Sequence, residues 1–303
     1  MSEHATGNHR IGGRTPADTA TILVEALPYV KGFAGKTIVV KLGGNAIDAE
    51  VDKALAQDVL LLRQVGVRCI VVHGGGPQID ETLRAFRIER KFSGGLRVTD
   101  AETLQAVRMT LVGRVNRDLV AKFNVEANDD PVAVGVSGED GGLLVAKQMD
   151  PALGFVGTVE HVRASLLTRL LDEGLVPIVS TVGADRSGQP FNINADAAAC
   201  AIATAVDAEK IVYLTAAPGL LRDADDAGTL IERLTPDEAR AMLGSGGVGE
   251  GMIPKLTACI EAVESGVPRA HILDGRIAHS LLIEMLTDEG IGTMITKEGI
   301  ARC

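Results

Sequence analysis

The stretch TIVVKLGGN, residues 37–45, decides the fold that we expect for this chain. Its apolar residues do not alternate strictly with polar ones, which is typical of a strand buried on both faces of a parallel sheet. Gly43 and Gly44 then turn the chain toward a segment with helical spacing. The stretch therefore predicts a strand, a turn and a helix, with Lys41 at the carboxyl end of the strand.

The same alternation of a buried strand and a helix recurs along the chain. Further runs rich in Val and Ile lie at residues 68–72, 131–136, 176–182, 210–214 and 270–273. Helical patterns lie between them at residues 50–65, at 99–119 after a capping box formed by Thr99 and Glu102, and at 197–206 after Asp196. Residues 143–162 favour β-hairpins instead. We expect an α/β protein with a mainly parallel, doubly wound sheet, whose ligands lie outside the carboxyl ends of the strands.

Composition narrows the class of protein. The 303 residues are 46% apolar and include 35 glycines, which indicates a folded chain with many tight loops. A net charge of −10 without a basic stripe argues against nucleic-acid binding. The sequence has no apolar run of about 18 residues and no signal-peptide layout, so we expect neither a membrane span nor export. The four scattered cysteines favour reduced thiols and a cytoplasmic protein.

The N-terminal region divides into two parts. We expect residues 1–15 to form a mobile polar tail and residues 16–34 to form a helix kinked at Pro28. Apolar residues of this helix, such as Ile22, Leu23 and Leu27, lie on one face. That face packs either on its own domain or on another subunit, and the residues alone leave both open.

Two glycine-rich loops at strand ends suggest a site for anions. His73-Gly-Gly-Gly-Pro77 follows the second strand as Gly43-Gly44 follows the first, and glycine lets backbone N–H groups approach an anion. Arg97, after Gly94-Gly95, offers a planar fork that matches a carboxylate, although a structural salt bridge would also explain it. Two other glycine motifs, at residues 35–37 and 244–249, do not follow a strand as nucleotide-binding loops do, and we reject them.

A second polar cluster adds charge. Asn192, Asn194 and Asp196 alternate along the chain, so in an extended segment their side chains share one face. Helix capping would explain Asp196 but not the two asparagines. Lys255 begins a helix near another glycine-rich loop, and Asp196 could hold Lys41 and Lys255 while both face a transferring phosphoryl group. A carboxylate acceptor has a reference pKa of about 4, so it needs no general base at neutral pH.

These motifs together resemble the amino-acid kinase family. KLGGNA, VVHGGGPQI, GLRVT, NINADAAA, GMIPK, HILDGR and LLIEMLTDEGIGTMI occur in the order that the family has, from about residue 17 to residue 296. The resemblance implies a three-layer αβα sandwich. It further implies a domain at residues 35–303, with an acetylglutamate lobe at about 35–205 and a nucleotide lobe at about 206–303.

The resemblance also implies roles. It makes Mg-ATP (ATP with Mg²⁺) the phosphoryl donor and N-acetyl-L-glutamate the acceptor, and it assigns no protein-bound metal. The resemblance assigns catalysis to Lys41, Asp196 and Lys255. It assigns substrate binding to Gly75, Gly76, Arg97 and Asn192. It assigns nucleotide binding to Gly44, Thr215, Gly219, Leu220 and Met252.

Further features resemble the family's arginine-inhibited, homo-hexameric branch. They are the N-terminal helix and an L-arginine effector set of Tyr29, Lys210, His271, Glu284 and Gly290. In that branch the N-terminal helices interlace between subunits. The chain departs from the family at Ala216, where an aspartate is usual, and at Thr158, where a glutamate is common. Two other readings therefore stay open: a related kinase for another carboxylate or carbamate, and a catalytically weakened arginine-binding protein.

Overall fold

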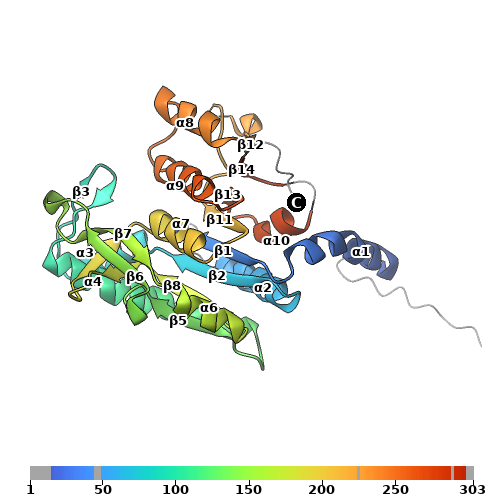
Figure 1. Ribbon diagram of the computed structural model, residues 1–303, viewed down its shortest axis with the longest axis horizontal. Coiled ribbons are helices and arrows are strands. Elements are labelled where there is room, and N and C mark those ends of the chain that lie inside the picture. Colours follow the sequence, from blue (N-terminus) through green and yellow to red (C-terminus); the bar gives the residue numbers. More distant parts are fainter. Residues whose placement is uncertain (1–14, 44–48, 224–225, 288–289, 298–303) are drawn as a thin grey trace, which may run out of the picture.

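Strand β1 (Thr37–Leu42) lies inside an eight-stranded sheet that forms the middle of the molecule (Figure 1). The computed structural model describes residues 15–43, 49–223, 226–287 and 290–297. The strand order is β12 (Arg233–Leu234), β14 (Thr293–Thr296), β13 (Arg269–Asp274), β11 (Lys210–Thr215), β1, β2 (Arg68–His73), β8 (Val176–Ser180) and β5 (Ala133–Ser137). Every neighbouring pair is parallel except β13 and β14. The predicted mainly parallel α/β sheet is confirmed.

Both faces of the sheet are covered by helices, because its side chains are apolar on both sides. Ile38 and Val40 belong to the hydrophobic core on one face, whereas Val39 belongs to the core on the other. The Val39 face packs against α6 (Ser165–Asp172), α7 (Ala195–Ala205), α8 (Pro236–Ser245) and α9 (Ile253–Glu264). The opposite face packs against α2 (Ala49–Gln64), α5 (Asn116–Glu126) and α10 (Ser280–Leu286). The three predicted layers are therefore present.

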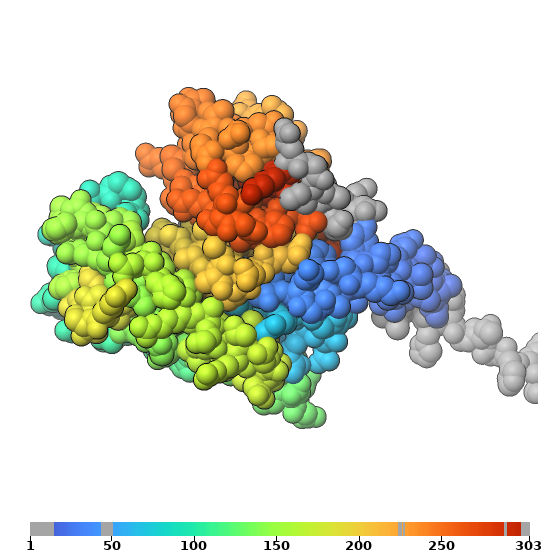
Figure 2. All heavy atoms as spheres, in the orientation of Figure 1, coloured from blue at the N-terminus to red at the C-terminus, as the bar shows by residue number. Residues whose placement is uncertain are grey.

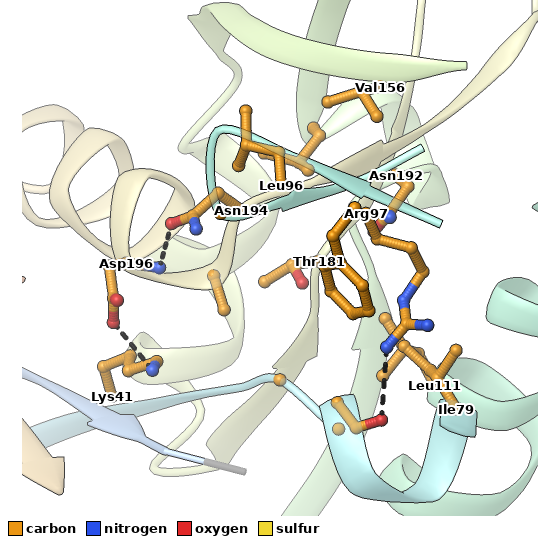
Figure 3. Close-up of a pocket in the computed structure, with 17 residues that line it drawn as sticks. Lys41, Ile79, Leu96, Arg97, Leu111, Val156, Thr181, Asn192, Asn194 and Asp196 are labelled. Carbon is orange, nitrogen blue, oxygen red and sulfur yellow. Dashed lines mark hydrogen bonds and ion pairs between the residues drawn. The ribbon is translucent and has the colours of Figure 1, made fainter. Parts of the chain in front are cut away.

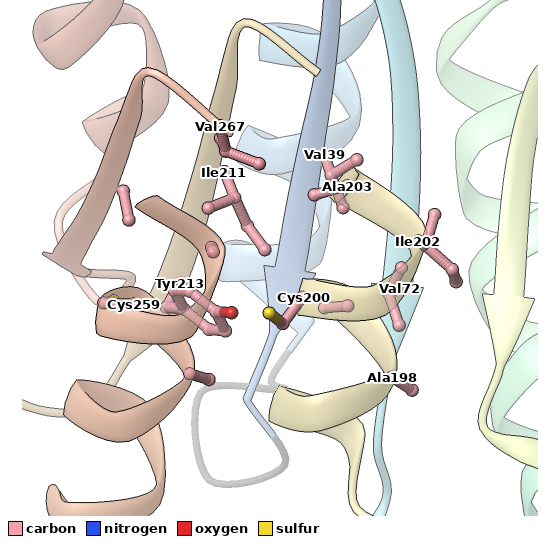
Figure 4. Close-up of a cluster of buried hydrophobic side chains, with 14 of the residues drawn as sticks. Val39, Val72, Ala198, Cys200, Ile202, Ala203, Ile211, Tyr213, Cys259 and Val267 are labelled. Atoms are coloured by element: carbon pink, nitrogen blue, oxygen red, sulfur yellow. The ribbon is translucent and has the colours of Figure 1, made fainter. Parts of the chain in front are cut away.

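Helix α7 packs closely on the sheet because its buried residues are small. Ala198, Cys200 and Ala203 face β1 and β2, and Tyr213 of β11 lies beside Cys200 (Figure 4). Small side chains let the helix backbone approach the strands. This close packing fixes the N-terminus of α7, and with it Asp196, against the carboxyl edge of the sheet.

A smaller sheet and a helical cluster complete the N-terminal part. The small sheet contains β6 (Leu144–Gln148), β7 (Val156–Val162), β9 (Val182–Ala184) and β10 (Pro190–Ile193). The antiparallel pair β6–β7 confirms the predicted hairpin. The predicted strand 176–182 instead ends at Ser180, and Val182 starts β9. Short elements are η3 (Asp140–Gly142), η4 (Pro151–Leu153), η5 (Ala227–Thr229) and the hairpin β3 (Phe92–Ser93) with β4 (Leu96–Arg97).

The helix predicted from a Thr99 capping box differs in the structure. Asp100 is the N-cap, and its side chain accepts a hydrogen bond from the Thr103 N–H at 2.8 Å. The helical chain then runs through α4 (Ala101–Arg108), a π-helical segment η2 (Met109–Val115) and α5. These elements pack beside α3 (Gly76–Ala85). The capping-box prediction was wrong because two adjacent residues could both cap, and Thr99 is used in a tertiary contact.

A second correction concerns the start of α7. The Asn194 side chain accepts hydrogen bonds from the N–H groups of Asp196 and Ala197, so Asn194 is the cap. Asp196 lies inside the first helical turn instead of preceding the helix. Because Asn194 satisfies the helix N-terminus, the Asp196 carboxylate is available for other partners.

Helix α1 (Pro16–Phe33) projects from the body of the molecule (Figure 1). Thr15, placed in the predicted tail, forms a capping box with Asp18, while residues 1–14 lie outside the described residues. Pro28 lies within the helix. Ile22, Leu23, Val24 and Leu27 are 44%, 67%, 68% and 46% exposed. These four side chains are therefore open to solvent in the single chain, whereas α1 contacts α10 and buries Phe33 in the core.

The surface is notched between the part that carries β3 and the C-terminal part that carries α8 and α9 (Figure 2). Among the described residues, none of the helices is long and apolar enough to cross a membrane.

Candidate functional site

Two lysines from distant parts of the chain meet on one buried carboxylate. Lys41 is the next-to-last residue of β1, and its Nζ lies 2.6 Å from Asp196 Oδ1 (Figure 3). Lys255, in the first turn of α9, places its Nζ 3.3 Å from Asp196 Oδ2. Lys41 and Asp196 are each only 5% exposed. The sequence-predicted catalytic trio is therefore a contiguous cluster at the carboxyl edge of the sheet.

Burial and charge act against each other in this cluster. Burial lowers the pKa of Lys41, and the nearby positive charge of Lys255 lowers it further, while Asp196 acts in the opposite direction. Burial alone would raise the pKa of Asp196, but the attraction of Lys41 and Lys255 holds that pKa below its usual value. The carboxylate thus stays ionised between two ammonium groups. With both lysines protonated, the cluster carries one excess positive charge, which suits an anionic ligand.

A pocket of about 230 Å³ opens beside Lys41 and Asp196. Gly74, Gly75 and Gly76 line it at the start of α3, and Arg97 and Asn192 line it from β4 and β10. A Cβ atom on Gly75 would lie 2.7 Å from Leu111 Cδ2 and 3.2 Å from Val115 Cγ2, so a larger residue there would displace these η2 side chains from the loop. All four sequence-predicted substrate residues are therefore brought together.

Arg97 is held from two sides. Its Nη2 lies 2.7 Å from Asp80 Oδ1 and donates to the Gly76 carbonyl at 3.4 Å. The guanidinium carbon lies 4.8 Å from the centroid of the Phe92 ring. Within the described part of the chain, its buried Nη1 has no hydrogen-bond partner. A salt bridge does exist, as the alternative interpretation required, but one arm of the fork is left for a carboxylate.

Sequence reasoning missed the residue that connects Asn192 with Arg97. Asn192 Nδ2 donates to Thr99 Oγ1 at 3.2 Å, and that hydroxyl donates to the Arg97 carbonyl at 2.9 Å. Thr99 is fully buried. The motif GLRVT contained it, but a local capping role concealed the long-range contact. Asp80 was also missed, since its partner lies on another element.

The predicted nucleotide residues lie along the same edge. Thr215 ends β11 beside β1, where the Gly43 N–H donates to the Leu214 carbonyl at 3.0 Å. Met252 is the N-cap residue of α9. Gly219 has φ 144°, and Leu220 is buried with its N–H donated to Thr293 Oγ1 at 2.8 Å. Gly44 lies outside the described residues.

The predicted effector residues lie elsewhere. Lys210 starts β11, at the opposite end of the strand from Thr215, and its Nζ lies 4.7 Å from the Phe33 ring centroid. His271 Nδ1 lies 2.8 Å from Glu284 Oε1, and burial lowers the pKa of His271 to about 4. Glu284 Oε2 also accepts from the Ile291 N–H, one residue beyond Gly290.

Tyr29 lines a separate pocket of about 600 Å³. Phe33, Lys36, Glu209 and Arg269 also line this pocket, whereas Lys210, His271, Glu284 and Gly290 do not. Phe33 connects the two groups, because the Lys210 ammonium lies over its ring. The effector residues therefore do not line a single pocket.

Comparison with known proteins identifies the family. Residues 36–274 match the Amino acid kinase family. A protein named acetylglutamate kinase from Caldanaerobacter subterraneus subsp. tengcongensis is 48% identical over 282 residues, or 92% of this chain and 93% of that relative. The chain therefore belongs to the amino acid kinase family. Within this family it groups with the acetylglutamate kinases.

Solved structures share the fold of this chain. N-acetylglutamate synthase from Neisseria gonorrhoeae, complexed with coenzyme A and N-acetyl-glutamate, has a TM-score of 0.80 at 29% identity over 93% of this chain. This chain spans 64% of that synthase chain. The same synthase with coenzyme A and L-arginine has a TM-score of 0.78 at 28% identity, covering 92% of this chain and 65% of the synthase chain. Carbamate kinase from Giardia lamblia, at 18% identity and a TM-score of 0.67, covers 88% of this chain and 99% of its own and shares the fold.

Proposed function

We propose that this chain transfers the γ-phosphoryl group of ATP to the γ-carboxylate of N-acetyl-L-glutamate. The product is N-acetyl-L-glutamyl 5-phosphate, an intermediate of arginine biosynthesis in the cytoplasm. A P–O bond to the carboxylate forms and the P–O bond to ADP breaks. The observation that carries the proposal is the pair of lysines on Asp196 beside a pocket with Arg97.

The charges of the cluster suit this reaction. Lys41 and Lys255 would stabilise the negative charge that spreads over the transferring phosphoryl oxygens, and Asp196 would keep both ammonium groups in place. The acceptor carboxylate is already ionised at neutral pH, so the chemistry requires no base. Mg²⁺ would be carried with the nucleotide. The described residues contain no group of three or more His, Cys, Asp or Glu side chains that could hold a metal ion.

The pocket would orient the acceptor. Arg97 Nη1 would bind the α-carboxylate of N-acetyl-L-glutamate, since the other arm of its fork is fixed by Asp80 and Gly76. Gly75 and Gly76 would donate backbone N–H groups to the γ-carboxylate, and Asn192 would bind the remaining polar atoms. Gly44, Thr215, Gly219 and Met252 would contact the nucleotide, with Leu220 supporting this turn through its hydrogen bond to Thr293.

The test is an ATP-dependent hydroxamate assay with N-acetyl-L-glutamate, free glutamate and carbamate as acceptors. We expect product only with N-acetyl-L-glutamate. Lys41→Met should reduce kcat by about 100-fold or more, because electrostatic stabilisation is the main catalytic contribution. Lys147→Met removes an exposed lysine of β6 and is the matched control. Wild-type turnover in Lys41→Met would refute the proposed role.

We also propose that L-arginine inhibits the enzyme and that the active form is a homo-hexamer. Glu284 would accept the guanidinium of arginine, with Tyr29, Lys210, His271 and Gly290 around it. The exposed apolar face of α1 supports a contact between subunits. A relative of the same fold was solved with L-arginine.

A further inference from the structure

A fully buried histidine stands directly before the glycine loop of the pocket. His73 is the last residue of β2, and its side chain is 0% exposed. Its ring lies within hydrogen-bond distance of two groups: Nδ1 is 2.9 Å from the Gly74 carbonyl oxygen, and Nε2 is 3.0 Å from Asn116 Nδ2. Neither His73 nor Asn116 lines the pocket.

These contacts determine the tautomer of the ring. A carbonyl oxygen can only accept, so Nδ1 must carry the proton and donate it to Gly74. The Asn116 amide nitrogen can only donate, so Nε2 must accept. The orientation of the Asn116 amide is itself fixed, because Nδ2 also donates to the Ile178 carbonyl at 2.8 Å and Oδ1 accepts from the Arg117 guanidinium.

The ring is therefore neutral. Burial is the main reason that the pKa of His73 falls to about 4, and the positive charge of Arg117 lowers it further, against the effect of the Gly74 hydrogen bond. A charged ring would place a second N–H against the Asn116 amide, which has no acceptor on that side.

The hydrogen bond to Gly74 has a consequence on the other side of the peptide. In a trans peptide the carbonyl oxygen and the following N–H point in opposite directions. The Gly74 carbonyl is directed back toward His73, so the Gly75 N–H is directed away from it. No hydrogen-bond acceptor for this N–H is found among the described residues, and Gly75 lines the pocket.

We propose that His73 and Asn116 form a positioning pair that orients the Gly74–Gly75 peptide and so directs the Gly75 N–H at the carboxylate of the acceptor. The role of this pair rests on the proposed function, because the acceptor is the group that the N–H would meet. The π-helical segment contributes from the other side: Asn116 follows η2 directly, and η2 places Leu111 against Gly75.

The kinetic test compares two substitutions of His73. His73→Leu removes the donor to Gly74, and we expect the KM for N-acetyl-L-glutamate to rise about tenfold or more with the KM for ATP unchanged. His73→Asn carries an amide at about the position of Nδ1 and should recover most of the loss. Val72→Ala is the control, since it opens a cavity in the same strand without touching the loop. An equal rise in KM in Val72→Ala, or none in His73→Leu, would overturn the proposal.

A spectroscopic test does not depend on catalysis. In ¹⁵N-histidine-labelled wild-type protein, His73 should show the neutral Nδ1–H tautomer at every pH from about 5.5 to 8. The amide resonance of Gly75 in the ligand-free protein should move in His73→Leu and return toward its position in His73→Asn. A charged ring, the opposite tautomer or an unmoved Gly75 resonance would contradict the positioning role. Absence of acetylglutamate phosphorylation in the wild-type protein would instead refute the proposed function, whereas these resonances would still decide the geometry.

Discussion

Asp196 gains its partners from residues far away in the sequence. Asn194 caps α7, and this leaves the carboxylate of Asp196 to Lys41 and Lys255. A buried charge is costly unless it is paired, so three ionised groups in one cluster are stable only together. The arrangement therefore keeps two cations close to each other at a position where an anion can bind.

Ala216 stands where the resemblance to the family leads us to expect an aspartate. It follows Thr215 at the end of β11. A carboxylate here could accept a hydrogen bond from the nucleotide or from a residue holding it, which is worth about 1.5–3 kcal/mol, or roughly 10- to 150-fold in affinity. We expect Ala216→Asp to lower the KM for ATP by about tenfold or more while kcat stays within a few-fold.

Steady-state kinetics with ATP as the varied substrate check this prediction, with Ala217→Asp as the matched control on the same turn. Unchanged nucleotide affinity in Ala216→Asp would mean that the departure is silent. If the wild-type protein binds arginine but shows no turnover at saturating ATP, it is a sensor and not a kinase.

The site could be predicted most directly where residues carry charge or glycine. Lys41, Gly75, Arg97 and Asp196 stand out in the sequence, because phosphate and carboxylate chemistry needs them. Thr99 does not, since a threonine beside Asp100 also suits a helix cap, and the choice between the two roles depends on Asn192 some ninety residues away. Tertiary contacts decide such cases, and local patterns do not contain them.

At the scale of elements, the π-helical segment η2 is the feature that the sequence did not indicate. Its seven residues continue α4 into α5, and the apolar pattern there resembles that of an ordinary helix. A π-helical turn contains an extra residue relative to an α-helix and is often found at functional sites. Here it positions Leu111 against Gly75 and leads directly into Asn116.

Removing the extra residue of η2 should impair its role at the pocket while the helix itself stays folded. We expect deletion of Gly113 to convert η2 to α-helix with little loss of stability, because the flanking helices keep their register. The KM for N-acetyl-L-glutamate should rise, since Leu111 would move away from Gly75. Gly113→Ala is the control: a Cβ there meets no atom within 4 Å, so the KM should not change. Urea unfolding and kinetics measure both effects, and a normal KM in the deletion variant would show that η2 has no role at the pocket.

Helix α1 carries the prediction about assembly. Its apolar face is exposed in the single chain, and burial of such a face stabilises an interface. Deleting residues 1–32 should reduce the oligomer size, because it removes the apolar face of α1. It should also reduce the sensitivity to arginine, because an allosteric coupling of about 1–3 kcal/mol requires two states of the protein that bind arginine differently, and α1 would be arranged differently in the two states. Deleting only residues 1–14, before the Thr15 cap, is the control. Light scattering and inhibition curves that match the wild type after the longer deletion would exclude the subunit contact.

For the whole molecule, the layered sheet was the most predictable feature. Continuous apolar runs such as residues 38–40 need cover on both faces, and short strands separated by helices can satisfy this only in a parallel sheet. The small sheet was less predictable: Val182 continues the apolar run of β8 in the sequence, but the chain leaves the large sheet after Ser180. The hydrophobic periodicity of the sequence does not show that the chain passes from the large sheet to the small sheet at this point.

The buried histidines make stability depend on pH across the whole molecule. Burial lowers the pKa of both His73 and His271 to about 4, from an ordinary value of 6.5. Between these values the unfolded chain binds protons that the folded state excludes, so stability falls as the pH drops from about 6.5 toward 4. Each group contributes a slope of at most roughly 1.4 kcal/mol per pH unit. Burial raises the pKa of Asp58, which gives a contribution of opposite sign at the acidic end.

We therefore expect the free energy of unfolding, measured with urea, to decrease from pH 7 to pH 5. The slope is the informative quantity, because His73→Asn and His271→Asn also change stability at neutral pH through lost contacts. Each substitution should reduce the slope, and the double variant should reduce it most. His161→Asn, which replaces an exposed histidine of β7, is the control for the substitution itself. If the double variant keeps the wild-type slope, the two rings are protonated in the folded state, and the neutral tautomer assigned to His73 is wrong.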